Sequence, residues 1–182
     1  MRLFTALDIS DDARAALVNL LSELAPAAPF QWSTPANLHI TTKFIGPWPV
    51  EDFDRLRAAL AAIPRPGALK IGIRGLGWYP NPHSPRVLFA GIHAGPELGI
   101  LHKATDEACA GIGIPAELKS FGAHLTLARV KTLEGLREVR RSIAGLPVTD
   151  FGEFSARAFH LYESVSSPGG SNYIKLEEFP LL

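Results

Sequence analysis

The sequence of 182 residues predicts an α+β protein with two pseudo-symmetric lobes, each a mostly antiparallel sheet with helices packed on its outside, and an active-site cleft between the sheets. Two observations support this fold class. Segments with the two-residue period of strands alternate with segments of helical apolar spacing, and their order in the first half repeats in the second. We therefore expect residues 1–182 to form one bilobal domain rather than a doubly wound parallel sheet.

The first half opens with the alternating, β-prone segment "RLFTALD" (2–8). The segment "SDDARAALVNLLSEL" (10–24) follows with helical apolar spacing, and Ser10 or Asp11 can cap it. After a proline-rich loop we expect a strand at 38–44, a helix at 50–63, and strands at 68–80 and 85–92.

The second half follows the same order. Its predicted elements are a helix at 95–113, a strand at 123–130, a helix at 132–146, and closing strands at 151–164 and 171–179. The loop-forming stretch "SVSSPGGSNY" (164–173) between the last two strands predicts a hairpin tip or a lip over a site.

Each half contains one strand with the pattern H-x-T, at 39–42 in "NLHITTKFIG" and at 124–127 in "AHLTLARV". Side chains alternate across a strand, so His39 and Thr41 share one face, as do His124 and Thr126. If the two strands are equivalent in related lobes, both polar faces meet at one cleft. The alternatives are a pair of buried structural histidines and a zinc site, although no third ligand stands at a suitable spacing.

The composition limits the kinds of partner and the cellular setting that we expect for the protein. Lysine plus arginine equals aspartate plus glutamate at 18 each, so the chain lacks the excess positive charge that holds a long polyanion, and a nucleic acid would be bound at an end. The single cysteine, Cys109, cannot form an internal disulfide, and no apolar run approaches about 18 residues. We expect a cytoplasmic monomer that does not bind a membrane.

The chain resembles the two-histidine phosphoesterases, and specifically the RNA 2′,3′-cyclic phosphodiesterases first described as 2′-5′ RNA ligases. The resemblance covers nearly the whole chain and rests on four segments in the order of that family: "RLFTALDIS", "NLHITTKFIG", "FGAHLTLARV" and "FHLYESVSSPGGSNYIKLEEFPL". One departure is Ala123, where relatives often have proline before the second histidine.

The resemblance implies hydrolysis of 2′,3′-cyclic phosphate at RNA or nucleotide ends to a 2′-phosphate, without a metal or another cofactor. It implies that His39 is the proton donor to the leaving oxygen and His124 the proton acceptor from water, with 2′-5′ ligation as the reverse reaction. Imidazole titrates near pH ~6.5, which suits both roles. The hydroxyls of Thr41 and Thr126 can donate hydrogen bonds to phosphoryl oxygens.

Four further residues are candidates for substrate binding. Arg129 matches a family position for phosphate contact, although its parity places it opposite His124 unless the strand bulges. Lys43 has the parity of His39, and Phe121 and Tyr162 can offer a ring to a terminal base. For each of these residues a structural role is the competing interpretation.

Three other functions remain open from the sequence. The same chemistry can act on another substrate, such as a 2′-5′ oligonucleotide, a 3′-end uridine tract or a cyclic ADP-ribose phosphate. The pocket can also bind RNA ends without turnover, or the paired strands can be a structural relic of duplication.

Overall fold

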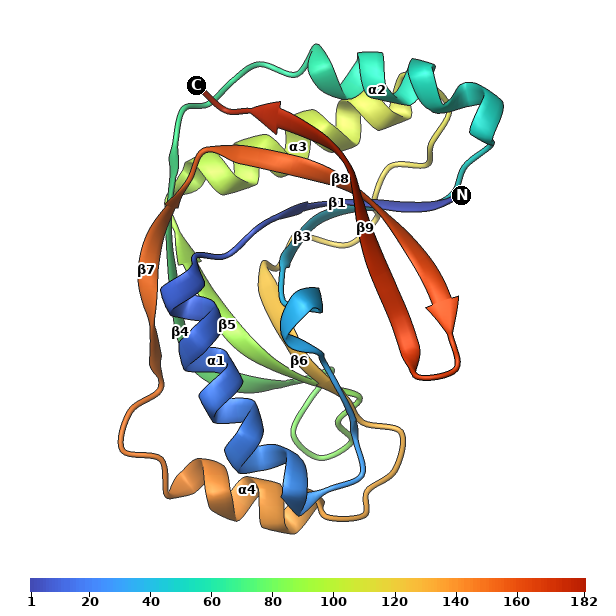
Figure 1. The fold of residues 1–182 in the computed structure, drawn as a ribbon. Helices are drawn as coiled ribbons and strands as arrows, with labels where there is room; N and C mark the ends of the chain where they lie inside the picture. The colour runs from blue at the N-terminus through green and yellow to red at the C-terminus, as the bar shows by residue number, and fades with distance from the viewer.

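A computed structural model describes all residues, 1–182, and Figure 1 shows its arrangement. The strands are β1 (Arg2–Leu7), β2 (Gln31–Trp32), β3 (Ile40–Pro47), β4 (Leu69–Tyr79), β5 (Val87–Ala94), β6 (His124–Arg129), β7 (Asp150–Ala156), β8 (Ala158–Ser167) and β9 (Gly170–Pro180). The helices are α1 (Asp11–Leu24), α2 (Phe53–Ala61), α3 (Pro96–Ala110) and α4 (Leu136–Ala144), with short 3₁₀ turns at Ala25–Ala27, Pro35–Asn37 and Val50–Asp52.

The strands form two antiparallel sheets, as the sequence predicts. One has the order β3-β1-β8-β9 and the other the order β2-β6-β5-β4-β7. Helices α2 and α3 contact each other and the four-stranded sheet, whereas α1 contacts β7 and α4 on the other lobe (Figure 1). The predicted α+β class with two antiparallel sheets is therefore confirmed.

The helix boundaries follow local chemistry. The side chain of Ser10 accepts a hydrogen bond from the backbone N–H of Ala13 at 3.2 Å, as a serine N-cap does, and Asp11 and Asp12 stand in the positively polarised first turn of α1. The apolar face of α1 is buried along its length, with Leu17 fully enclosed. None of the helices is long and apolar enough to cross a membrane.

Two expectations about the strands are wrong. The segment 151–164 is not one strand, because it breaks at Arg157 into β7, which joins the five-stranded sheet, and β8, which joins the four-stranded sheet. The sequential halves are also not the lobes. Strands β4 and β5 of the first half pair in the sheet of the second H-x-T strand, while β8 and β9 pair with β1 in the sheet of the first.

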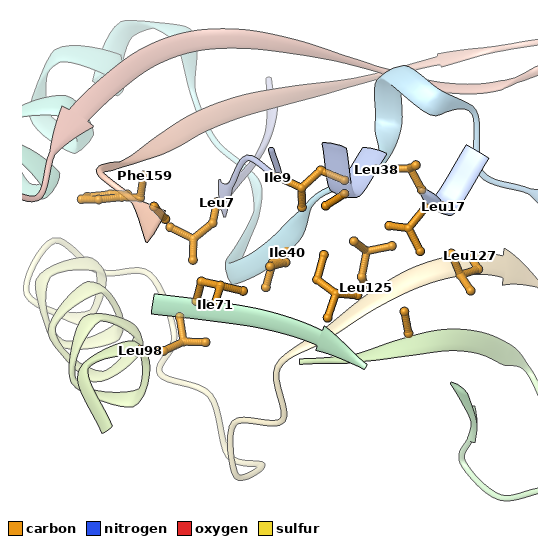
Figure 2. Close-up of a cluster of buried hydrophobic side chains, with 14 of the residues drawn as sticks. Leu7, Ile9, Leu17, Leu38, Ile40, Ile71, Leu98, Leu125, Leu127 and Phe159 are labelled. Atoms are coloured by element: carbon orange, nitrogen blue, oxygen red, sulfur yellow. The ribbon is translucent and has the colours of Figure 1, made fainter. Parts of the chain in front are cut away.

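One apolar core joins the two sheets. Figure 2 shows Ile40 from β3, Ile71 from β4, Leu125 from β6 and Leu98 from α3 directed toward a common cluster. Each of these side chains is at most 4% exposed. The residues that alternate with Ile40 and Leu125 point away from this core, and they are the histidines and threonines of the two H-x-T patterns.

Candidate active site

In both H-x-T strands, alternate side chains point to the core and to the candidate site. Ile40 and Leu125 are completely buried, whereas His39 is partly exposed and His124 is exposed. His39 lies directly before β3 and His124 is the first residue of β6. Strand alternation therefore places each imidazole, with the threonine two residues later, on the face opposite the core.

The two imidazole rings are held in the same way. In each ring Nδ1 lies at hydrogen-bond distance from the backbone carbonyl two residues earlier, Asn37 O at 2.6 Å for His39 and Gly122 O at 2.9 Å for His124. A carbonyl only accepts, so Nδ1 carries the proton and donates in both rings. The nitrogen left for proton transfer is Nε2 in each case, and Nε2 of His39 contacts the Thr41 hydroxyl at 2.9 Å.

The pKa of His39 is lowered from its ordinary value by its burial and by charges on the other lobe. Burial is the main factor that lowers the pKa of His39, and the positive charges of His124 and Arg129 lower it further. The carbonyl of Asn37 and the carboxylate of Asp8 act in the opposite direction and raise this pKa. Strands β3 and β6 contact each other, which brings His124 and Arg129 near enough to His39 for their charges to act on it.

A β-bulge at the same place in both strands determines what else lies on this face. In the pairing of β3 with β1, Thr41 and Lys43 face adjacent residues and Thr42 is the extra residue; in β6, Leu127 is the extra residue opposite β5. In each strand the extra residue lies three positions after the histidine. Beyond it, each side chain points to the face opposite the one that strict alternation predicts. Arg129 therefore shares the face of His124. Strict alternation along the sequence would place it on the opposite face, and the bulge is what brings it to this one.

The predicted placement of Lys43 on the face of His39 is wrong for the same reason. The bulge turns its side chain inward, where it is 2% exposed and its ammonium donates to Asp106 at 2.6 Å and to the carbonyl of Pro115 at 3.0 Å. The residue that shares the face of His39 is instead Phe44, which pairs with Phe4 and is 61% exposed.

Aromatic rings surround His39. The Phe4 ring lies 5.0 Å from the imidazole, the Tyr173 ring meets it edge-on at 5.1 Å, and Tyr162 stacks on Phe4 at 5.4 Å. Tyr162 thus lies 6.5 Å from the His39 ring, and its binding of a base stays a prediction. Phe4 and Tyr173 were not predicted, although both occur in segments on which the family resemblance rests.

Phe121 stacks on another side chain of the protein, in agreement with the structural interpretation. Its ring is stacked on His102 with centroids 4.1 Å apart and planes 5° from parallel, and Nδ1 of His102 contacts the carbonyl of Thr42 at 2.6 Å. One face of the Phe121 ring is therefore covered by the protein itself. Phe89 of β5, which was not predicted, lies edge-on to His124 at 5.7 Å.

Asp8, directly after β1, forms a polar cluster beside these rings. Its carboxylate accepts hydrogen bonds from Lys175 Nζ at 2.5 Å and from the hydroxyl of Tyr162, and it lies 3.6 Å from Nδ1 of His160. Partial burial would raise the pKa of Asp8, but the bonds from Lys175 and Tyr162 and the charge of His160 outweigh it and lower this pKa. Burial and the carboxylate of Asp8 together raise the pKa of Tyr162.

Hydrogen bonds also hold the segment that leads from β2 to His39 against both sheets around the site. Ser33 Oγ donates to the carbonyl of Thr126 at 2.9 Å, and β2 pairs Gln31 with Arg129. Asn37 Nδ2, in the turn before His39, donates to the carbonyl of Ser171 at 2.6 Å. The predicted lip at 164–173 is thus the end of the β8–β9 hairpin, and it contacts the segment that carries His39.

Comparison with known proteins agrees with this arrangement. The model of the family described as LigT like Phosphoesterase matches residues 7–89, which include His39. An RNA 2′,3′-cyclic phosphodiesterase of Archaeoglobus fulgidus is 35% identical over 180 residues, covering 98% of this chain and 99% of its own. One of Thermus thermophilus is 33% identical over 193 residues, covering 100% of this chain and 90% of its own.

Solved structures have the same fold. The crystal structure of TT0787 of Thermus thermophilus superposes with a TM-score of 0.81 at 30% identity and covers 100% of this chain and 98% of its own. E. coli LigT complexed with 3′-AMP gives a TM-score of 0.79 at 20% identity, covering 98% of this chain and 97% of its own, and shows the fold. The resemblance drawn from the sequence is confirmed, and the chain belongs to the LigT-like phosphoesterase family, among the RNA 2′,3′-cyclic phosphodiesterases.

Proposed function

We propose that this protein is an RNA 2′,3′-cyclic phosphodiesterase that opens the cyclic phosphate at RNA or nucleotide ends and leaves a 2′-phosphate. Relatives that match over nearly the whole chain carry that activity in their names. The observation that carries the proposal for this chain is the pair of H-x-T strands from two sheets, in which a backbone carbonyl fixes Nδ1 of each histidine and leaves Nε2 directed away from the backbone.

The reaction needs two proton transfers on opposite sides of phosphorus. A water oxygen bonds to phosphorus as the bond to the ribose 3′-oxygen breaks; one group takes the water proton and another gives a proton to the leaving oxygen. We assign the first role to Nε2 of His124 and the second to Nε2 of His39. The exposure of His124 supports its role beside water, and the aromatic surroundings of His39 suit the ribose.

Hydroxyl and guanidinium groups would stabilise the charge on the phosphoryl oxygens. Thr41, Thr126 and Arg129 all lie on the faces of the two histidines, and hydrogen bonds to a charged oxygen contribute about 1.5 to 3 kcal/mol each. Thr41 contacts His39 Nε2 in the free protein, so a substrate oxygen must replace it there. The reverse reaction, with a ribose 5′-hydroxyl as nucleophile, would form a 2′-5′ linkage.

The decisive test is cleavage of an oligonucleotide ending in a 2′,3′-cyclic phosphate in excess chelator, with the product assigned by phosphorus NMR. His39→Ala and His124→Ala should each lower turnover about 10²- to 10⁴-fold while the circular dichroism spectrum stays unchanged. His83→Ala, which alters an exposed loop histidine, is the matched control. Full activity of either site variant would refute the assignment, and loss of wild-type activity in chelator would refute a metal-independent reaction.

The setting of this activity is part of the proposal. We propose a cytoplasmic monomer that acts on RNA ends or nucleotides bearing a 2′,3′-cyclic phosphate. A single cysteine that is fully buried, and equal numbers of acidic and basic residues, support an intracellular enzyme that recognises a terminus rather than a long polyanion.

A further inference from the structure

The two H-x-T strands differ at the position just beyond their common bulge. Three residues after the threonine, β6 has Arg129 and β3 has Phe44, and the bulges place both on the side of the histidines. A site that is pseudo-symmetric in its backbone is thus asymmetric in its chemistry. It offers a cation on the lobe of His124 and a flat aromatic ring on the lobe of His39.

The Phe44 ring is accessible and has an apolar neighbour. Its side chain is 61% exposed, and Leu118, in the loop between α3 and β6, is fully exposed. Both line a groove of about 440 Å³ between the end of β3 and that loop, together with Ile45, Ile114 and Lys119. Exposed apolar side chains gathered in one groove mark a binding surface more often than scattered ones do.

This groove lies close to the active site. The Phe4 ring lies 5.0 Å from the His39 ring and 6.2 Å from the Phe44 ring, so Phe44 is at most about 11 Å from His39. Stacked nucleotides advance about 3.4 Å each along a strand. The groove is therefore within about three nucleotides of the phosphate that His39 would serve.

The proposed reaction fixes the direction in which the RNA chain leaves the site. In an in-line displacement the water and the leaving oxygen lie on opposite sides of phosphorus. The leaving oxygen belongs to the terminal ribose, so that ribose lies on the side of the proton donor, His39. The rest of the RNA is attached through the same ribose, so it leaves the site from the side of β3, where Phe44 is an exposed ring within its reach.

We infer that the groove between Phe44 and Leu118 binds a base of the single-stranded RNA, one to three nucleotides upstream of the cyclic phosphate, by stacking on the Phe44 ring. This inference rests on the proposed function. The charge of Lys43 is paired with Asp106, and Lys119 and Glu117 on the groove are opposite in sign, so the groove offers little net charge. Stacking on an aromatic ring accepts every base, and the groove would favour oligonucleotides over mononucleotides without a sequence preference.

The test compares kcat/KM for a pentaribonucleotide ending in 2′,3′-cyclic phosphate with that for a nucleoside 2′,3′-cyclic phosphate. The wild type should prefer the oligonucleotide, and Phe44→Ala should lower kcat/KM for it about 5- to 100-fold, as loss of one stacked base predicts, with the mononucleotide value within about twofold. Phe44→Trp should keep the preference. The fold-loss should be the same at low and high salt, because the contact is uncharged.

Leu133→Ala, at a leucine that is 63% exposed in the loop before α4, is the control for loss of surface apolar area and should keep the length preference. Equal kcat/KM for the two substrates in the wild type, or an unchanged preference in Phe44→Ala, would overturn this inference and leave the proposed function standing. Failure of the wild type to open either substrate would overturn the proposed function itself.

Discussion

At the level of single residues, Asp8 is the charge that opposes the burial of His39. Burial among Phe4, Tyr162 and Tyr173 lowers the pKa of His39, as do the charges of His124 and Arg129, whereas the Asp8 carboxylate raises it. Asp8 is itself partly neutralised by Lys175 at 2.5 Å and also lies 3.6 Å from His160. We therefore expect Asp8 and Lys175 to set the pKa of His39, the proposed acid, without touching the substrate.

Replacing Asp8→Asn should move the alkaline limb of the pH–rate profile to lower pH. A proton donor is active only below its pKa, and loss of the carboxylate leaves burial and the two cations to lower the pKa of His39 further. At alkaline pH we expect turnover about 3- to 10-fold below that of the wild type, with a smaller difference on the acid side. The measurement is kcat/KM against pH, paired with NMR titration of the His39 imidazole.

The opposite shift should follow from Lys175→Met. This variant removes the ammonium that neutralises Asp8, so the carboxylate acts more strongly on His39 and the alkaline limb should move to higher pH. Lys103→Met, at an exposed lysine of α3 paired with Glu107, is the matched control and should leave the profile unchanged. Shifts of the same sign in the Asp8 and Lys175 variants would contradict this tuning role.

At the level of the elements, the β-bulges explain which site residues the sequence could reveal. His39, Thr41, His124 and Thr126 precede the bulges, and two-residue alternation predicted their faces. Lys43 lies beyond a bulge, and its predicted face was wrong. A bulge depends on how a strand pairs with its neighbour, and neither "TTKF" nor "TLAR" contains a glycine or proline that would announce one.

The bulge in β3 also gives Lys43 a structural task. Its ammonium binds Asp106 of α3 and the carbonyl of Pro115, and the same carboxylate accepts from the N–H of Glu117 at 3.1 Å. These contacts hold the loop between α3 and β6 against β3, and that loop ends in the Gly122 carbonyl that fixes His124. A buried ion pair therefore connects the strand of one histidine to the support of the other.

Lys43→Met should destabilise the protein by about 3 kcal/mol, because it leaves the partly buried Asp106 carboxylate without its cation. For a chain of this length that corresponds to a fall in Tm of about 6 to 12 °C. The double variant Lys43→Met with Asp106→Leu should recover most of the loss, since neither charge remains. A double variant as unstable as Lys43→Met alone, measured by differential scanning calorimetry, would contradict this interpretation.

At the level of the whole molecule, the sequence predicted the repeat but not the exchange of strands between lobes. The equivalent orders β3-β1-β8 and β6-β5-β4 each contain strands of both halves, because β8 of the second half joins β1 of the first, and β5 of the first half joins β6 of the second. Strand patterns indicate where a strand begins and ends, but its partner is set by long-range packing. The single core, with Ile40 and Leu125 in one cluster, results from that exchange (Figure 2).

The exchange of strands leads us to expect a single cooperative unfolding transition, since neither sheet keeps its full set of strands when the other half unfolds.

Trp48 follows β3 of the four-stranded sheet, whereas Trp32 and Trp78 lie in β2 and β4 of the other. In a variant with Trp32→Phe and Trp78→Phe, the fluorescence comes from Trp48 and reports on the four-stranded sheet. In Trp48→Phe it comes from the other two tryptophans and reports on the five-stranded sheet. Within each variant, the fluorescence midpoint in guanidinium chloride should coincide with that of far-UV circular dichroism, which reports both sheets. Because each variant is compared with itself, a loss of stability from the substitutions does not affect the result. Lobes that fold independently would instead give a fluorescence midpoint separated from the circular dichroism midpoint in at least one variant.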